Sequence, residues 1–435
     1  MTGAGTAPAT EARPGLPLLP DPRVVEALVV WTALAACWLR GRLPVPLVVL
    51  VAAVGLHGLV LARWPARRGL RLACLAMTLV LLGVLPTALY ARATDRGSVH
   101  LAIDGSVLVS DEAVRVLLDG DDPYRASYEQ VLAGSPIDVQ GRPAANPLID
   151  HYPYWPGSLG PLLAVEVPAR ALGFDPEPRV LYLLVYCLLG LWLGWWSLRE
   201  RGHVGVALAV CLNPWLLPYL WQGSNEILLV AGVAVAAVAL TSRRVVLAGL
   251  ALGLAVSVKH LLAPMVLLFL VWLAAEARRG RLGRGQAWRA AAASLAPAAL
   301  AAAPFLAWHP ADLLTDTVGY HLALVSDAYP IAGEGLPALL LRARVLTDPF
   351  GPTPLWATAL PAAVVVLLGA WRVWSRPRLR TLLGVSGLVM LGVLFFHRSF
   401  MLYYVAVPIT ALVLAALVGG QASRTRFSSF TRSRQ

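Results

Sequence analysis

The sequence is poor in charged residues and in cysteine. Only 14% of its residues are charged, whereas soluble domains carry roughly 25%, so a soluble multi-domain enzyme is a poor interpretation. The four cysteines lie inside apolar runs and lack metal-binding spacing, which argues against a disulfide framework and a zinc site. Patterns such as HExxH, Walker loops and dinucleotide-binding glycine motifs are not present in a convincing context. We therefore predict no metal site.

Lysine is almost absent, because Lys259 is the only lysine beside thirty-five arginines. The net charge of +12 would indicate a nucleic-acid partner if the arginines formed one patch. They form short clusters between apolar runs instead, for example at Arg278, Arg279 and Arg281. We expect no nucleic-acid partner, and we interpret the clusters as topology signals, since loops rich in arginine tend to remain cytoplasmic.

Apolar residues are abundant and make up 58% of the chain. They form repeated runs that match the roughly 20 residues needed to cross a bilayer as a helix. The sequence therefore predicts an all-α polytopic membrane protein with about twelve transmembrane helices. The predicted spans lie near 24–40, 44–62, 70–91, 178–198, 204–220, 227–241, 245–258, 261–275, 289–307, 356–373, 381–396 and 401–418.

The charges predict an orientation for these helices. The arginine clusters fall on one side of a twelve-span layout, while eighteen of the 24 acidic residues lie in the two long loops 92–177 and 308–355. We expect those loops to be extracytoplasmic and both termini to be cytoplasmic. The chain is then divided into a disordered N-terminal tail (1–23), a transmembrane domain with its two loops (24–418) and a basic C-terminal tail (419–435). Long loops of this kind usually carry function, although a solvated acidic cap is the simpler alternative.

The first long loop offers candidate carboxylates. The segment from Asp111 to Leu118 has helical spacing and ends at the turn DGDDPY, and Asp104 lies just before it. A carboxylate held at the membrane boundary can serve as a general base for a hydroxyl group. Any one exposed aspartate is more often simply solvated, and the residues alone do not choose among them.

An aromatic and proline-rich segment, NPLIDHYPYWPGSLGPLL, follows in the same loop. Tyr152, Tyr154 and Trp155 can anchor the chain at the headgroup zone, where such rings are favoured. Aromatic rings near carboxylates also suit sugar rings, so the same three residues are candidates for an acceptor or sugar site. The apolar stretch after them fits a re-entrant or interfacial segment.

Polar residues interrupt three apolar runs on the predicted outer side. Asn225 and Glu226 lie where polar groups are costly in a membrane. Lys259 with His260, and later His397 with Arg398, add cations on that side. These four can hold a phosphate at the lipid–water boundary or act as ordinary snorkelling anchors, and the sequence leaves both interpretations open.

The order of these motifs resembles the GT-C superfamily of membrane glycosyltransferases. The series runs from an early aspartate before LLDGDDPY through HYPYWPG, NPWLLPYLWQGSNE, AGLALGLAVSVKHLLAPMVLL and YPIAGEGL to HRSFMLYY. It is most similar to the actinobacterial branch of glycosyltransferase family 87, the polyprenol-phosphate-mannose-dependent mannosyltransferases. The sequence departs from the family pattern in having Glu226 after Asn225, DGSVLVSDEAV after the third span, and three spans rather than one before the first long loop.

The resemblance implies a function. A sugar, mannose in the most similar branch, would pass from a polyprenyl-phosphate donor to a glycolipid or polysaccharide acceptor in the cell envelope. The transfer would occur outside the cell membrane, with inversion and without nucleotide, cofactor or obligatory metal. The family's base is an aspartate in the first exterior loop, which by position corresponds to Asp104, with Asp111 as the alternative.

Two other functions fit the layout. Twelve spans with cytoplasmic termini are common in secondary transporters, although no inverted repeat is visible. A non-catalytic envelope assembly or lipid-flipping protein would use the acidic loops to bind partners. Vesicle uptake assays separate the first alternative from a transferase, which produces no substrate-dependent flux.

Overall fold

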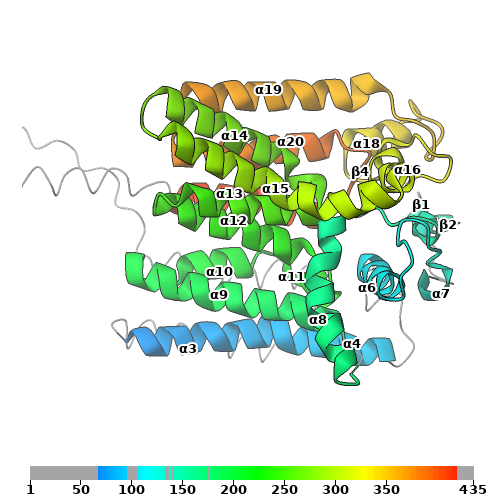
Figure 1. The fold of residues 1–435 in the computed structure, drawn as a ribbon, viewed down its shortest axis with the longest axis horizontal. Helices are drawn as coiled ribbons and strands as arrows, with labels where there is room; N and C mark the ends of the chain where they lie inside the picture. Colours follow the sequence, from blue (N-terminus) through cyan, green and yellow to red (C-terminus); the bar gives the residue numbers. More distant parts are fainter. Residues whose placement is uncertain (1–66, 96–104, 133–136, 140–141, 175, 419–435) are drawn as a thin grey trace, which may run out of the picture.

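The computed structural model describes residues 67–95, 105–132, 137–139, 142–174 and 176–418. Both predicted tails, the first two predicted spans and Asp104 lie outside these residues. Within them helices predominate, as predicted, and the strands form two short pairs (Figure 1).

Five helical segments of the described chain are long and apolar enough to cross a membrane, and four shorter apolar helices accompany them. These nine segments coincide with predicted spans, so the multi-pass character is confirmed, whereas the count of twelve stays a prediction. The long segments are α3–η1–α4 (Arg68–Arg92), α9 (Arg179–Arg201), η4–α14 (His260–Arg278), α15 (Arg284–Trp308) and η6–α19 (Leu355–Ser375). The shorter ones are α12 (Glu226–Thr241), α13 (Val245–Val258), α20 (Leu379–Phe395) and η7–α21 (Leu402–Leu417).

The predicted span 204–220 is not one continuous helix. It consists of α10 (Gly205–Cys211) and α11 (Leu217–Trp221), separated by a turn at Asn213. Pro214 disfavours helical backbone at the preceding residue. The Asn213 side chain stabilises the break, because its Oδ1 accepts from the Trp215 amide at 3.0 Å and its Nδ2 donates to the Ala406 carbonyl at 2.9 Å.

Close packing of α13 on α15 is made possible by two glycines. A β-carbon at Gly249 would collide with the carbonyl oxygen of Ala290. One at Gly253 would lie 2.6 Å from the carbonyl oxygen of Ala293. Small residues four positions apart let two helix backbones approach closely. Inside a bilayer the hydrophobic effect does not drive helices together, so the van der Waals contacts of such a close approach stabilise the pair. The close contact fixes the C-terminal end of α13, directly before Lys259.

The two long loops contribute short elements that lie together at one end of the bundle (Figure 1). In the first loop α6 ends where predicted but begins six residues before Asp111, and α8 runs across the direction of the bundle helices, as expected of an interfacial segment. The first loop contains α6 (Gly105–Leu118), α7 (Glu129–Leu132), β1 (Ile137–Val139), β2 (Arg142–Ala144), η2 (Pro147–Ile149), η3 (Pro156–Ser158) and α8 (Leu159–Ala171). The second contains α16 (Pro310–Leu314), η5 (Thr315–Gly319), α17 (Tyr320–Leu322), β3 (Ala332–Gly333) and α18 (Leu336–Arg342).

Each short strand pair has a defined register. β1 and β2 form an antiparallel pair in which Ile137 lies opposite Ala144. β3 pairs in parallel with β4 (Ser399–Phe400), so that Ala332 lies opposite Ser399. The second pair joins the second long loop to the segment before the last apolar helix.

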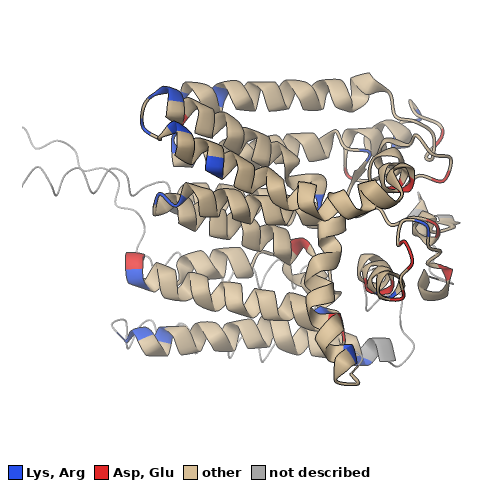
Figure 2. Cartoon of the chain, in the orientation of Figure 1, with Lys and Arg blue, Asp and Glu red and all other residues tan. Residues whose placement is uncertain are grey.

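Charge is distributed unequally along the bundle (Figure 2). Most arginines gather at the end where α9 finishes and where α14 meets α15, and most carboxylates lie at the opposite end, around the two long loops. The separation that the sequence implied is therefore present in three dimensions. We call these the arginine end and the acidic end.

Candidate functional site

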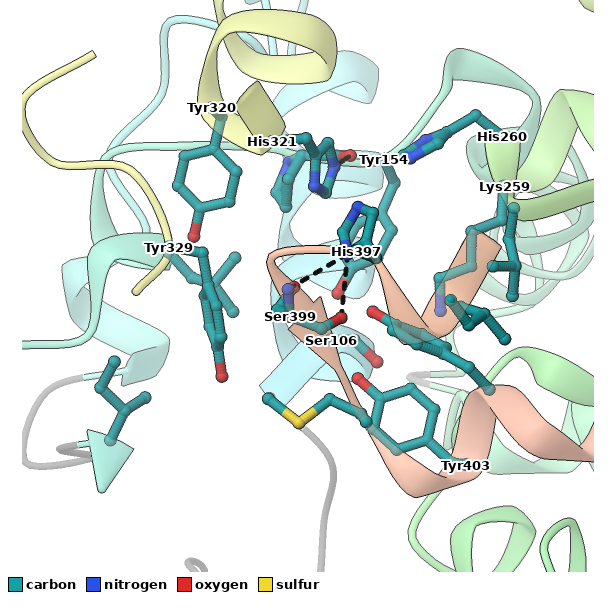
Figure 3. A pocket seen from close by; sticks show the side chains of 18 of the residues that line it. Ser106, Tyr154, Lys259, His260, Tyr320, His321, Tyr329, His397, Ser399 and Tyr403 are labelled. Carbon is teal, nitrogen blue, oxygen red and sulfur yellow. Dashed lines mark hydrogen bonds between the residues drawn. The ribbon is translucent and has the colours of Figure 1, made fainter. Parts of the chain in front are cut away.

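A cavity of about 400 Å³ opens at the acidic end of the bundle. Its walls come from the start of α6, the HYPYWPG segment, η4, the second long loop and the MLYY segment before α21 (Figure 3). No carboxylate belongs to the described residues that line it. The wall is instead composed of apolar groups, tyrosines, three histidines, one lysine, one asparagine and two serines.

Lys259 lies in the cavity wall because α13 stops at Val258. Its backbone is extended, with φ −151° and ψ 123°, and η4 begins at the next residue. The side chain is buried, and its Nζ donates to Asn225 Oδ1 at 3.2 Å and forms an ion pair with Glu226. A buried charge needs such partners, since desolvation without them is costly.

Three tyrosine rings surround the same ammonium group. The ring centres of Tyr154, Tyr403 and Tyr404 lie 5.6, 5.5 and 5.0 Å from the Nζ of Lys259. The negative ring faces add cation–π attraction, which is stronger where water is excluded. The arrangement holds a cation in place at an aromatic surface.

Asn225 and Glu226, predicted to bind acceptor or sugar, are buried residues at the start of α12 that do not line the cavity. Ser224 also donates to the Glu226 carboxylate. The structure thus places both predicted residues beneath Lys259, where they orient its ammonium group.

Three histidines from distant parts of the sequence meet beside Lys259. His260 belongs to η4, His321 to α17, and His397 follows α20. Each offers a ring nitrogen, and these atoms all lie within 4.8 Å of one another. Figure 3 shows the three rings gathered at one side of the cavity. His260 and His397 were predicted site residues, whereas His321 was missed.

Burial keeps two of these imidazoles neutral. Desolvation, aided by the positive charge of Lys259, lowers the pKa of His321 to about 4, although a bond from its ring to the Pro153 carbonyl opposes the shift. Desolvation also lowers the pKa of His397, with the nearby Arg398 charge acting in the same direction. Both rings are therefore neutral near pH 7 and able to donate one hydrogen bond and accept another.

Arg398, predicted to bind phosphate, does not line the cavity. Its buried guanidinium donates to the carbonyls of Tyr329 at 2.7 Å, Gly351 at 2.6 Å, Phe350 at 2.8 Å and Pro349 at 3.1 Å. These bonds tie the second long loop to the start of β4. The structure brings Lys259, His260 and His397 together and turns Arg398 toward a structural contact.

The two candidate bases occupy different positions. Asp104 lies outside the described residues, but Gly105 and Ser106, which follow it directly, line the cavity. Asp111 lies one to two turns further along α6, where it pairs with Arg115 at 3.0 Å, and it is not part of the cavity wall.

Of the predicted aromatic residues only Tyr154 lines the cavity. Tyr152 is fully buried, and its hydroxyl bonds that of Ser158 at 2.6 Å. Trp155 is half-buried outside the wall. Glycine at position 157 lets this segment pack on α13, since a β-carbon there would lie 2.5 Å from the carbonyl oxygen of Ser257.

The HYPYWPG segment is fixed to the second long loop by several contacts, of which those of Asp316 are buried. His151 Nδ1 lies 2.6 Å from Asp316 Oδ1, and the Tyr152 amide donates to Asp316 Oδ2 at 2.8 Å. Burial alone would lower the pKa of His151, but its bonds to Asp316 and Asp327 raise it overall. A comparable contact joins Asp122 to His309 at 2.7 Å. Together they hold Tyr154 against the cavity.

Comparison with known proteins places this site within a family match. Residues 163–397 match the family model of glycosyltransferase family 87, which is more than half of the chain. The match includes Lys259 and all three cavity histidines. A search of curated proteins finds no match.

Proposed function

Because this chain belongs to glycosyltransferase family 87 and is a multi-pass membrane glycosyltransferase, we propose that it moves mannose from a polyprenyl-phosphate donor to a cell-envelope acceptor. The cavity at the acidic end carries this proposal, since Lys259, three histidines and the start of α6 meet there. The arginine end would face the cytoplasm and the acidic end the outside. The acceptor is a glycolipid or a polysaccharide.

The donor phosphate would bind beside Lys259, His260 and His397. Negative charge grows on the leaving phosphate as the glycosidic bond breaks, so fixed donors and a fixed cation stabilise the transition state more than the ground state. Asn225 and Glu226 orient the ammonium group in advance, which reduces the reorganisation needed during transfer. Arg398 contributes by holding the second loop in place.

The general base would be Asp104, with Asp111 as the alternative. Gly105 and Ser106 line the cavity, which supports a role for the residue directly before them. Asp111 is paired with Arg115, a contact that lowers its value as a proton acceptor. Direct displacement requires the base on the face of the sugar opposite the leaving phosphate, where it removes the proton from the acceptor hydroxyl.

The sugar or acceptor would pack on the tyrosine surface. Tyr154, Tyr403 and Tyr404 present rings to the cavity around Lys259. Tyr152, also predicted here, supports this surface from behind, since its ring centre lies 5.5 Å from that of Tyr154. Trp155, the third predicted residue, does not line the cavity.

The decisive experiment follows label from donor to product. Membranes containing the protein are incubated with radiolabelled polyprenyl-phosphate-mannose, and lipid and polysaccharide fractions are analysed. We expect label in one envelope product, with none in membranes that carry Lys259→Met at equal abundance. A product labelled equally well by that variant, or labelled only from a nucleotide sugar, would refute the proposed donor site.

A further inference from the structure

The three cavity histidines form a group with the composition of a metal site. Their ring nitrogens lie within 4.8 Å of one another and come from three separate segments. Zinc binds imidazole nitrogen at about 2.0–2.1 Å, so three ligands on one ion lie roughly 3.5 Å apart. Side-chain rotations that move each ring by about an ångström would close the group on an ion.

The outer contacts of two rings match those of metal ligands. His321 Nε2 lies 2.9 Å from the Pro153 carbonyl oxygen. His397 Nδ1 is held by Ser399, whose carbonyl oxygen lies 3.0 Å away and whose amide donates to the ring nitrogen at 3.2 Å. A ligating histidine usually donates its second nitrogen to a carbonyl or carboxylate, which fixes ring orientation and tautomer. These contacts leave Nδ1 of His321 and Nε2 of His397 for an ion.

The third ring supplies an independent observation. The Nδ1 atom of His260 is buried and has no hydrogen-bond partner among the described residues. A buried polar atom without a partner is costly, and a coordinated ion would satisfy it. The three rings also border the cavity, which leaves room for a further ligand from that side.

We propose that His260, His321 and His397 bind one divalent transition-metal ion of the zinc class, with one coordination position open to the cavity. Three nitrogen ligands without a carboxylate suit zinc, cobalt or copper better than magnesium or calcium, which prefer oxygen. Three protein ligands and an open position are typical of reactive rather than structural zinc sites. The open position would bind an oxygen of the donor phosphate, a step that rests on the proposed function.

Cobalt binding tests the site without any transfer reaction. The full-length protein, purified without a polyhistidine tag and stripped with a chelator, is titrated with Co²⁺ and followed by visible absorption and bound-metal analysis. We expect one equivalent of Co²⁺ and the intense absorption of a tetrahedral site. We expect each of three substitutions to weaken Co²⁺ binding at least tenfold: His260→Gln, His321→Gln and His397→Gln. Changing even a residue that only hydrogen-bonds to a metal ligand typically has an effect of about this size.

A matched control comes from the opposite end of the bundle. His203, whose Nδ1 accepts from the Gly205 amide at 3.1 Å, lies away from the cavity, and His203→Gln should bind Co²⁺ like the unaltered protein. Equal binding by the three cavity variants, or no stoichiometric binding by the unaltered protein, overturns the site. If a variant fails to fold, the stoichiometry and spectrum of the unaltered protein still decide.

A second titration separates the metal site from the proposed donor. Adding a short-chain polyprenyl phosphate to the Co²⁺-loaded protein should shift the absorption bands by replacing the open-position ligand. Unchanged bands would refute phosphate ligation while the metal site stands. Transfer that fails although the bands shift would instead count against the proposed function.

Discussion

The two ends of the bundle are built from the same apolar helices but differ in how their polar residues are used. At the arginine end the charges are mostly exposed and make few specific contacts, for example Arg279 to the Trp374 carbonyl at 3.0 Å. At the acidic end polar groups are buried and bonded to one another, as in the Lys259–Glu226 pair. Exposed charge sets orientation at little energetic cost, whereas buried charge must be held by partners.

The largest expected effect is at the acidic end, at the predicted base. Asp104→Asn keeps the side-chain shape but removes the proton acceptor, so transfer should fall by about 10²–10⁴-fold. Labelled-product formation is measured in membranes with equal protein abundance. Asp111→Asn is the matched control and should have a milder effect. The reverse result would move the base to Asp111.

Chemical labelling of introduced cysteines from outside the cell tests the comparison of the two ends directly, because each end should be either fully accessible or inaccessible to the reagent. Thr315 is exposed in the second long loop and Gly283 is exposed at the arginine end. A cysteine at position 315 should react with an impermeant maleimide in intact cells, and one at position 283 only after permeabilisation. The opposite pattern would invert the predicted topology.

Breaking the buried pair should cost both activity and stability. Lys259→Met leaves the Glu226 carboxylate buried without its cation, and losing one partner of a buried pair costs about 3–5 kcal/mol. Replacing both residues, Lys259→Met with Glu226→Gln, should restore much of the thermal stability but not the transfer activity. Recovery of activity in the double variant would show that the ammonium group is dispensable.

A smaller and different effect is expected at Arg398. Arg398→Lys cannot reproduce four bonds to carbonyl groups, because lysine lacks the planar guanidinium. Protection of the second long loop against proteolysis should decrease, and turnover should fall through that change. If the variant instead raised only the KM for the donor and left the rate of proteolysis unchanged, Arg398 would bind the phosphate.

The smallest effect concerns pH. Partners Asp316 and Asp327 raise the pKa of His151, which also packs beside Tyr320. A group with a raised folded-state pKa stabilises the fold fully below its ordinary pKa of about 6.5, and this contribution is lost as pH rises through the raised value. Hydrogen-exchange protection at residues 310–322 should therefore be lower at alkaline pH. In His151→Gln the pH dependence should disappear.

Hydropathy predicted the helices well because apolar runs of this length leave the backbone few alternatives in lipid. It did not predict the break at Asn213, where a proline and a side-chain contact to Ala406 interrupt an apolar run. Hydropathy averaged over a stretch of residues reports the composition of that stretch and does not reveal a single break in the helix.

The site was predictable only in part. Polar residues inside apolar runs identified Lys259 and His260, since such positions are costly. His321 gave no such signal, because a histidine in a polar loop is ordinary and its neighbours form no motif. His397 and Arg398 are adjacent, yet one faces the cavity and the other a set of carbonyls. Side-chain direction at a non-helical junction depends on tertiary contacts that spacing does not encode.

The solitary lysine has a consequence for chemical labelling. Because Lys259 lines the cavity and no other lysine exists in the chain, it carries the only side-chain primary amine. A lipid phosphate bearing an aldehyde, added with a mild hydride reductant, would form a single secondary-amine adduct at that position, apart from any at the chain terminus. Mass spectrometry of one peptide would then report occupancy of the cavity. Lys259 is thus a single site for covalent affinity labelling by ligands of the cavity.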